Sequence, residues 1–245
     1  MQRAKRRTWP DDLIPDEQWR VYKEVIARAR EKGIRFVLGG GFAISTYTGH
    51  WRNTKDMDLY VLASEREAMI QTTADVGLRD FYERQPYDRR WIFRSACGDI
   101  IVDIIWAMAN LRTLVDDGWM RDGGEFSMRG ERIGVVPPEE MVWNKLYVMQ
   151  YDRCDWTDVF NLFYSVGAEL DWDYLIQRMG DDIPLLAGAL SVYRWMCPGK
   201  SRAIPADVWE KLQVPPPRPQ AIPEIDWHRS SLLDIRPWFA VAEAR

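Results

Sequence analysis

The spacing of hydrophobic residues predicts that helices and strands alternate along the first half of the chain. Residues 17–32 place an apolar side chain at every third or fourth position, which is typical of an amphipathic helix. Short apolar runs of about five residues are typical of buried strands. The expected strands are 34–38, 57–62, 90–96, 99–106 and 132–136, and the other expected helices are 42–47, 64–76 and a short one around 111–119.

From residue 138 onward the apolar spacing is helical throughout. The expected helices are 138–150, 156–166, 172–179, 183–195 and 206–212. Five prolines between residues 215 and 223 then indicate an extended linker. The sequence therefore predicts an α/β core over 1–136, a helical domain over 137–212, and a Pro-rich linker with a C-terminal tail over 213–245.

The C-terminal tail is unusually apolar for a terminal segment. It carries the five large apolar residues Trp227, Leu232, Leu233, Trp238 and Phe239. Exposing so much apolar surface is unfavourable, so we expect the tail to pack on its own domain or on a partner subunit. A homodimer formed through this tail is therefore one alternative.

Composition narrows the class of protein. The 245 residues are 47% hydrophobic and 29% charged, as in an ordinary globular protein. A net charge of -4 argues against a general nucleic-acid binder. The arginines at positions 84, 89, 90 and 94 are interpreted as solvated surface, with an RNA contact as the alternative.

Cysteine usage and apolar runs indicate a compartment. The three cysteines are widely separated and form neither a disulfide framework nor a zinc-ligand pattern, which favours a reducing cytoplasm. The longest apolar run, 100–109, is too short to cross a bilayer and contains Asp103, so no membrane association is expected.

Residues 38–62 carry the clearest chemical pattern. A strand runs into the glycine turn 39–41, and Asp56 and Asp58 open the next strand. Side chains two apart on a strand project from the same face. Two neighbouring carboxylates repel each other unless a cation lies between them, and Mg²⁺ prefers carboxylate oxygens while leaving room for phosphates. The pattern therefore predicts a metal and phosphate site.

This stretch resembles the nucleotidyltransferase superfamily that includes DNA polymerase β. Gly40 and Gly41 match its glycine turn, and Asp56 and Asp58 match its carboxylate pair. The segment that begins at Arg52 is similar to the R-x-T-x-D-x-D variant of small-molecule nucleotidyltransferases and abortive-infection toxin enzymes. The spacing from Gly41 to Asp56 is slightly longer than in that family, as a loop insertion would make it.

The resemblance implies a fold and an activity. The fold would be a small mixed-sheet nucleotidyltransferase core of the α/β class, here followed by a helical C-terminal half. The activity would be transfer of a nucleoside monophosphate from an NTP, such as ATP, to an acceptor hydroxyl, with Mg²⁺ or Mn²⁺ and release of pyrophosphate. Backbone amides at Gly40 and Gly41 would position the phosphates, and Arg52 or Lys55 would offset the charge of the leaving pyrophosphate. A surface-loop role for Arg52 and Lys55 is an equal alternative.

Asp103 is the one charged residue of the apolar stretch 100–106, which follows Asp99 in the expected strand. An unpaired carboxylate is costly to bury there. One interpretation is a core aspartate satisfied by a neighbouring arginine or a backbone amide. The resemblance favours another, because in this family a third catalytic and metal-binding carboxylate comes from a strand beside the first pair.

A second group of charges precedes the helix expected at 156–166. Asp155 and Asp158 lie three positions apart and can share a helix face, which is also the pattern of a simple helix cap. The resemblance implies a catalytic Lys-Asp-x-x-Asp element, but Cys154 stands in the lysine position. Lys145 or Arg153 would then supply the positive charge. Capping and catalysis stay open for Asp155.

The acceptor is not specified by these residues. A small hydroxylated molecule is favoured. The alternatives are RNA or protein, as for toxin–antitoxin type enzymes, and a catalytically silent nucleotide-binding partner protein. Asp56, Asp58 and Asp103 together argue against the silent alternative.

Overall fold

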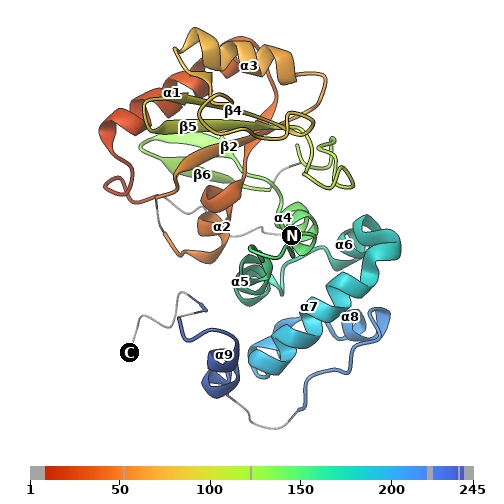
Figure 1. The fold of residues 1–245 in the computed structure, drawn as a ribbon. Coiled ribbons are helices and arrows are strands. Elements are labelled where there is room, and N and C mark those ends of the chain that lie inside the picture. The colour runs from red at the N-terminus through yellow and green to blue at the C-terminus, as the bar shows by residue number, and fades with distance from the viewer. Residues whose placement is uncertain (1–8, 52, 122, 220–222, 237, 240–245) are drawn as a thin grey trace. The chain divides into compact units, whose positions relative to one another are not determined.

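The computed structural model describes residues 9–51, 53–121, 123–219, 223–236 and 238–239. Within these ranges the chain divides into two units. The first comprises residues up to 46 together with 51–137, and the second comprises residues 47–50 together with the chain from 138. Figure 1 shows the sheet in the first unit and the succession of helices in the second. The predicted α/β class, with a mixed sheet followed by helices, is confirmed.

A five-stranded mixed sheet with the order β1-β2-β5-β4-β3 forms the centre of the first unit. Strands β2 and β5 are parallel neighbours, whereas the other pairs are antiparallel. The strands are β1 (Phe36–Leu38), β2 (Asp56–Val61), β3 (Arg79–Asp80), β4 (Ile92–Cys97) and β5 (Ile100–Ile105). A separate two-stranded sheet consists of β6 (Glu125–Met128) and β7 (Glu131–Gly134).

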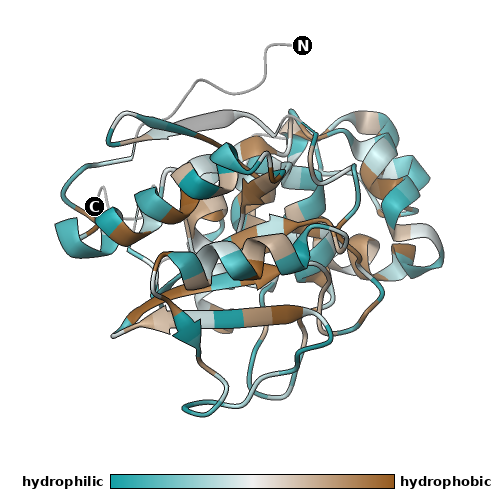
Figure 2. Cartoon of the chain, turned by 90° about the horizontal axis from the view of Figure 1, so that it is seen from above, coloured by the Kyte–Doolittle hydropathy of each residue, from teal (hydrophilic) through white to brown (hydrophobic). Residues whose placement is uncertain are grey.

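Helices α1 (Asp16–Glu31) and α3 (Arg66–Asp75) pack beside each other and against β5 (Figure 1). Helix α1 buries one apolar stripe that includes Trp19, Tyr22 and Ile26, as its period predicts. The strands carry long hydrophobic stretches, whereas the helices alternate hydrophilic and hydrophobic positions (Figure 2). Helix α2 (Gly40–Thr48) follows β1 directly, so the glycine turn becomes its first residues.

The second unit is helical. Its helices are α4 (Pro138–Leu146), α5 (Trp156–Val166), α6 (Trp172–Met179), α7 (Ile183–Met196), α8 (Ala206–Lys211) and α9 (Trp227–Leu233). Two short 3₁₀ segments, η1 (Gly180–Asp182) and η2 (Lys200–Ala203), connect them. Asp171 caps α6 by accepting a hydrogen bond from the backbone N–H of Tyr174.

The C-terminal tail packs on its own unit. Phe239 is buried and stacks on Tyr164 of α5, with ring centroids 4.6 Å apart. Trp238 lies against Phe160 of the same helix. Trp238 and Phe239 thus pack on the same chain, as expected, whereas Leu232, Leu233 and Ile235 of the tail are exposed. A homodimer through the tail stays a prediction.

Two predicted helices are wrong, and one helix was not predicted. The short helix expected around 111–119 is absent from the described residues, because the Asn110 side chain accepts hydrogen bonds from the backbone N–H groups of Arg112 and Thr113 and forms a turn instead. The helix expected over 138–150 ends at Leu146, where the chain turns back so that Asp155 N–H bonds to Val148 C=O. Helix α9 lies in the C-terminal tail, to which the sequence analysis assigned no helix or strand.

No helix within the described ranges is long and apolar enough to cross a membrane.

Candidate active site

Strand register aligns the functional residues in one row across the sheet. Asp58 on β2 lies opposite Asp103 on the parallel strand β5, and Asp103 lies opposite Arg94 on the antiparallel strand β4. Gly39 continues the row beyond β2, where its N–H donates to Asp58 C=O over 2.9 Å. Because residues directly opposite each other share a face, Asp58, Asp103 and Arg94 project from the same side of the sheet.

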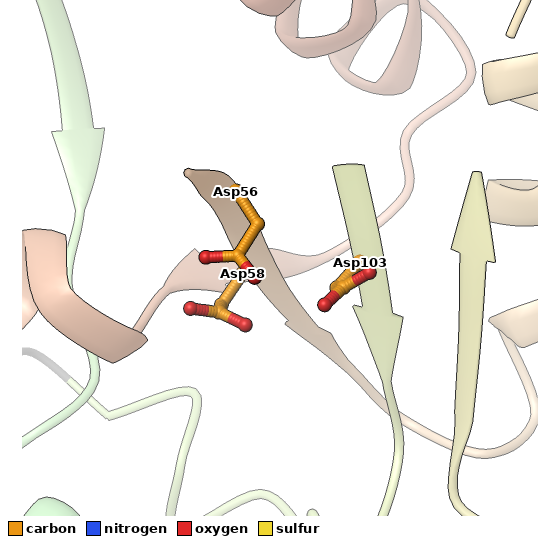
Figure 3. Close-up of side chains that lie close together, drawn as sticks. All are labelled: Asp56, Asp58 and Asp103. Atoms are coloured by element: carbon orange, nitrogen blue, oxygen red, sulfur yellow. The ribbon is translucent and has the colours of Figure 1, made fainter. Parts of the chain in front are cut away.

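Three carboxylates converge on this face. Asp56, Asp58 and Asp103 each offer an oxygen, and these oxygens all lie within 4.8 Å of one another. Figure 3 shows Asp56 and Asp58 on one strand and Asp103 on its neighbour. The two β2 carboxylates are partly exposed, whereas Asp103 is buried. The structure therefore brings together the three aspartates that the sequence singles out.

The start of α2 lies against this cluster. A methyl group placed on Gly40 would lie 1.7 Å from Asp58 Oδ2, so only glycine fits there. Gly40 also has a φ of 54°, which favours glycine. The first N–H groups of a helix have no partner within it and favour anions. A methyl group on Gly41 would meet Thr54 Cγ2 at 2.5 Å, so the second glycine is also closely confined.

Arg94 pairs with two of the three carboxylates. Its Nε donates to Asp103 Oδ1 over 2.8 Å, and its Nη2 donates to Asp103 Oδ2 and, over 3.1 Å, to Asp56 Oδ2. Both interpretations of Asp103 are thus compatible, because the aspartate is satisfied by a neighbouring arginine and also belongs to the carboxylate cluster.

Burial and charge act on the ionisable groups of the cluster. Burial raises the pKa of the Asp103 carboxyl, and Arg94 opposes that rise. Hydrogen bonding to Asp103 raises the pKa of the Arg94 guanidinium, which stays charged. Burial also raises the pKa of Tyr22, with a further contribution from Asp56 and the other two carboxylates, so this phenol keeps its proton near the cluster.

A hydrogen-bond chain connects α1 to the start of β2. The Gln18 amide donates to Tyr22 Oη over 2.9 Å and accepts from Asn53 Nδ2 over 3.0 Å. Thr54 Oγ1 donates to the Asp56 carbonyl over 2.6 Å. These bonds hold the segment that precedes Asp56 in place. The sequence did not predict them, because the polar residues of this segment follow no helical or strand spacing.

Lys55, predicted to contact phosphate, lies in the same segment. It lines a hollow of about 500 Å³ together with Gln18, Asn53, Asp99 and other residues of the first unit. Its position directly before Asp56 is consistent with either a phosphate contact or a surface charge. Arg52, the other candidate for the pyrophosphate, lies outside the described residues.

The second predicted constellation forms within the second unit. Lys145 Nζ donates to Asp155 Oδ2 over 2.8 Å and lies 2.6 Å from Asp158 Oδ2. Asp155 occupies the N-cap position of α5, but its side chain makes no capping hydrogen bond. Its carboxylate is held by Lys145 and Arg153 instead, which lower its pKa against the opposing effect of burial. Simple capping therefore does not explain Asp155.

Two residues of the site were not assigned from sequence. We interpreted Arg94 as one of several surface arginines, and Tyr22 as a core residue of the first helix. Sequence does not identify the pairing of Arg94 with Asp103, because this pairing depends on a turn at Gly98-Asp99. The expected strands 90–96 and 99–106 imply a turn at Cys97-Gly98, which would place residue 94 opposite residue 101. No sequence pattern pointed to the phenol of Tyr22.

The residues of the cluster suit a hard divalent cation. All three ligands offer carboxylate oxygens, which Mg²⁺ and Mn²⁺ prefer, and no soft sulfur or imidazole ligand belongs to the described cluster. The confined glycine at the start of α2 leaves space beside Asp58 that any other side chain would fill.

The structure thus combines a carboxylate pair on one strand, a third carboxylate on its parallel neighbour and a glycine-led helix beside them, as the sequence resemblance predicts. The chain belongs to the family described as "Nucleotidyl transferase of unknown function (DUF2204)", which matches residues 18–161. That range includes Asp56, Asp58 and Asp103, and the recognised resemblance is confirmed.

The chain is similar to several solved structures, of which the first shows a shared fold. The solution structure of the antibiotic-resistance factor ANT(2'')-Ia has 19% sequence identity and a TM-score of 0.52, and the match covers 71% of this chain and 97% of that one. The crystal structure of ANT(2'')-Ia with adenylyl-2''-tobramycin has 18% identity and a TM-score of 0.45, with coverage of 72% and 99%. The lincomycin-bound lincosamide antibiotic adenylyltransferase LnuA has 16% identity and a TM-score of 0.43, with coverage of 62% and 96%. No curated protein matches the sequence.

Proposed function

We propose that this nucleotidyltransferase moves a nucleoside monophosphate from an NTP to a hydroxyl group of a small molecule, with release of pyrophosphate. The observation that carries the proposal is the convergence of Asp56, Asp58 and Asp103 within 4.8 Å beside the glycine-led start of α2. Three carboxylates so close together serve no evident packing purpose and suit divalent cations that also bind phosphate.

The donor would bind at the carboxylate pair and the glycine turn. Asp56 and Asp58 would hold Mg²⁺ or Mn²⁺, and when bound these ions stabilise the attacking and leaving oxygens of an in-line displacement. The amides at Gly40 and Gly41 would orient phosphate oxygens, as helix N-termini do. Lys55, and Arg52 if it reaches the site, would offset charge on the departing pyrophosphate.

The acceptor would react on the Asp103 side of the cluster. Asp103 with Asp56 would hold the ion next to the acceptor hydroxyl. Arg94 donates hydrogen bonds to both oxygens of Asp103 and opposes the rise in its pKa that burial causes, which favours the ionised carboxylate that this role requires. The phenol of Tyr22 keeps its proton and can donate a hydrogen bond, but it is not a base in this scheme.

Lys145 and Asp155 are proposed as the polar residues that the second unit contributes to the reaction. Their pairing is supported by the buried Lys145 ammonium, which is held between two carboxylates. The expected Lys-Asp-x-x-Asp pattern has cysteine, Cys154, at its lysine position. Lys145 would supply the positive charge that this cysteine cannot. We propose that Asp155 acts in transfer and Lys145 in holding phosphate.

The acceptor class follows from charge and from the fold. The net charge of -4 favours a neutral or cationic small molecule over RNA. The ANT(2'')-Ia protein of similar fold is an antibiotic-resistance factor, so hydroxylated antibiotics are the first acceptors to test.

The deciding experiment incubates the purified protein with each NTP, labelled in the α-phosphate, and with Mg²⁺ or Mn²⁺ and separate pools of aminoglycosides, lincosamides, tRNA and protein. The proposal predicts a labelled small-molecule product and an equivalent amount of pyrophosphate. Label in RNA or protein alone would assign a different acceptor class. Absence of pyrophosphate with every pool, from a protein that binds Mn²⁺, would contradict transfer activity.

A further inference from the structure

Strand register places the Arg94 side chain against two carboxylates of the cluster, those of Asp103 and Asp56. Arg94 lies directly opposite Asp103 on antiparallel strands, so the two side chains leave the sheet from the same face. The pairing is thus part of the sheet itself and does not depend on a loop. Its guanidinium contacts both oxygens of Asp103 and one oxygen of Asp56.

The two partners of Arg94 differ in exposure. The Asp103 side chain is 1% exposed, whereas those of Arg94 and Asp56 are 23% and 29% exposed. A buried carboxylate without a partner is strongly unfavourable, so Asp103 depends on Arg94 whenever no cation is present. Asp56 lies at the more open side, where an arriving cation can displace the guanidinium more easily.

The charge balance has a consequence for metal binding. Three carboxylates and one guanidinium leave two negative charges at the cluster. A bound cation therefore meets less negative charge than the three aspartates alone would provide, and it competes with Arg94 for oxygens of Asp56 and Asp103.

We infer that Arg94 is a positioning residue that holds Asp56 and Asp103 together in the metal-free protein and thereby weakens the affinity of the cluster for divalent cations. This role rests on the proposed function, because it assigns the cluster to a metal. With Arg94 in this role, the aspartates are already in place before the cation and the NTP bind. The weakened affinity would also allow the cation to leave readily after transfer.

The test measures Mn²⁺ binding without nucleotide, by calorimetry and by thermal melting in EDTA and in Mn²⁺. Arg94→Met should melt at a lower temperature than the wild type in EDTA. It should bind Mn²⁺ at least about tenfold more tightly and gain more in melting temperature from Mn²⁺, since one positive charge is removed from the cluster. Arg90→Met removes an exposed arginine that pairs with Asp88, and it should match the wild type in both measurements.

A folded Arg94→Met protein whose Mn²⁺ affinity is unchanged or weaker would overturn the inference. Failure of both proteins to bind Mn²⁺ would overturn it as well. A purely packing role for Arg94 would lower the melting temperature in EDTA and Mn²⁺ equally.

A second variant covers the case in which Arg94→Met does not fold. Asp103→Asn removes the carboxylate charge with which Arg94 pairs. In the wild-type background it should lower the melting temperature in EDTA, because Arg94 loses its partner. In the Arg94→Met background it should restore folding, because it removes the buried charge that has lost its partner. Equal destabilisation in both backgrounds would show that the two residues do not act together. These measurements need no NTP or acceptor, so absence of transfer would contradict the proposed function and leave the role of Arg94 standing.

Discussion

Gly40 and Asp58 approach so closely that a methyl group on Gly40 would lie 1.7 Å from Asp58 Oδ2. Gly40→Ala should therefore displace the Asp58 carboxylate and also strain the backbone, whose φ is 54°. We expect a loss of about 1–3 kcal/mol in the free energy of unfolding, together with weaker Mn²⁺ binding. Urea denaturation and calorimetry measure the two effects.

Gly33→Ala is the matched control for that substitution. Gly33 has a φ of 68°, but an added methyl group there would meet no atom within 4 Å. The control should lose stability by about 1–2 kcal/mol from backbone strain and leave Mn²⁺ binding intact. Equal Mn²⁺ binding by both variants would mean that Gly40 does not shape the metal site.

Asp58→Asn tests the carboxylate pair itself. The substitution keeps the volume of the side chain and removes the charge that a divalent cation needs, so we expect transfer to fall by more than about 100-fold with the fold intact. Asp99→Asn, in the turn between β4 and β5, removes an exposed carboxylate and should transfer at the wild-type rate. Wild-type turnover by a folded Asp58→Asn protein would contradict the assigned mechanism.

Much of the site could be predicted because its residues lie in regular strands. The two-residue spacing of Asp56 and Asp58 is enough to predict that they lie on one face of a strand. Asp103 can be recognised because it interrupts the otherwise apolar strand β5. The segment around 107–119 could not be predicted in this way. The side-chain oxygens of Asn110 and Asp116 accept hydrogen bonds from backbone N–H groups and determine its turns, and these bonds override apolar spacing.

The contact between Lys145 and Asp155 predicts a pH dependence of stability. The folded-state pKa of Asp155 is lowered, so its contribution is present above the unfolded value of about 3.9 and is lost as the pH falls through the folded value. Asp155→Asn should therefore reduce the stability at pH 7 and flatten its decline between about pH 5 and pH 3. Urea midpoints across this range measure the change.

Asp152→Asn is the control for the acid series, since it alters net charge equally at an exposed side chain. Its stability should decline with acid as that of the wild type does. An unchanged acid profile of the Asp155→Asn protein would show that the Lys145 contact does not stabilise the second unit.

A buried ion pair in the second unit provides a further stability test. The Glu140 side chain is fully buried and accepts hydrogen bonds from Arg178, whose guanidinium also lies 4.1 Å above the Trp143 ring. Arg178→Met should cost about 3–5 kcal/mol, because it leaves a buried carboxylate without its cation. Lys211→Met breaks exposed pairs and should cost nothing measurable in the same urea titration.

The parallel pairing of β2 with β5 also determines when the active site forms during folding. Asp58 and Asp103 are direct neighbours in space but are separated by a helix, a short strand and half of a hairpin along the chain. A nascent chain that ends before β5 carries the glycine turn and two aspartates, but lacks β5 and with it the third aspartate. Such long-range pairing forms late and slowly, so the capacity to bind a divalent cation should appear only after the central strands have joined. The appearance of cation binding during refolding would thus mark the moment at which β5 has paired with β2.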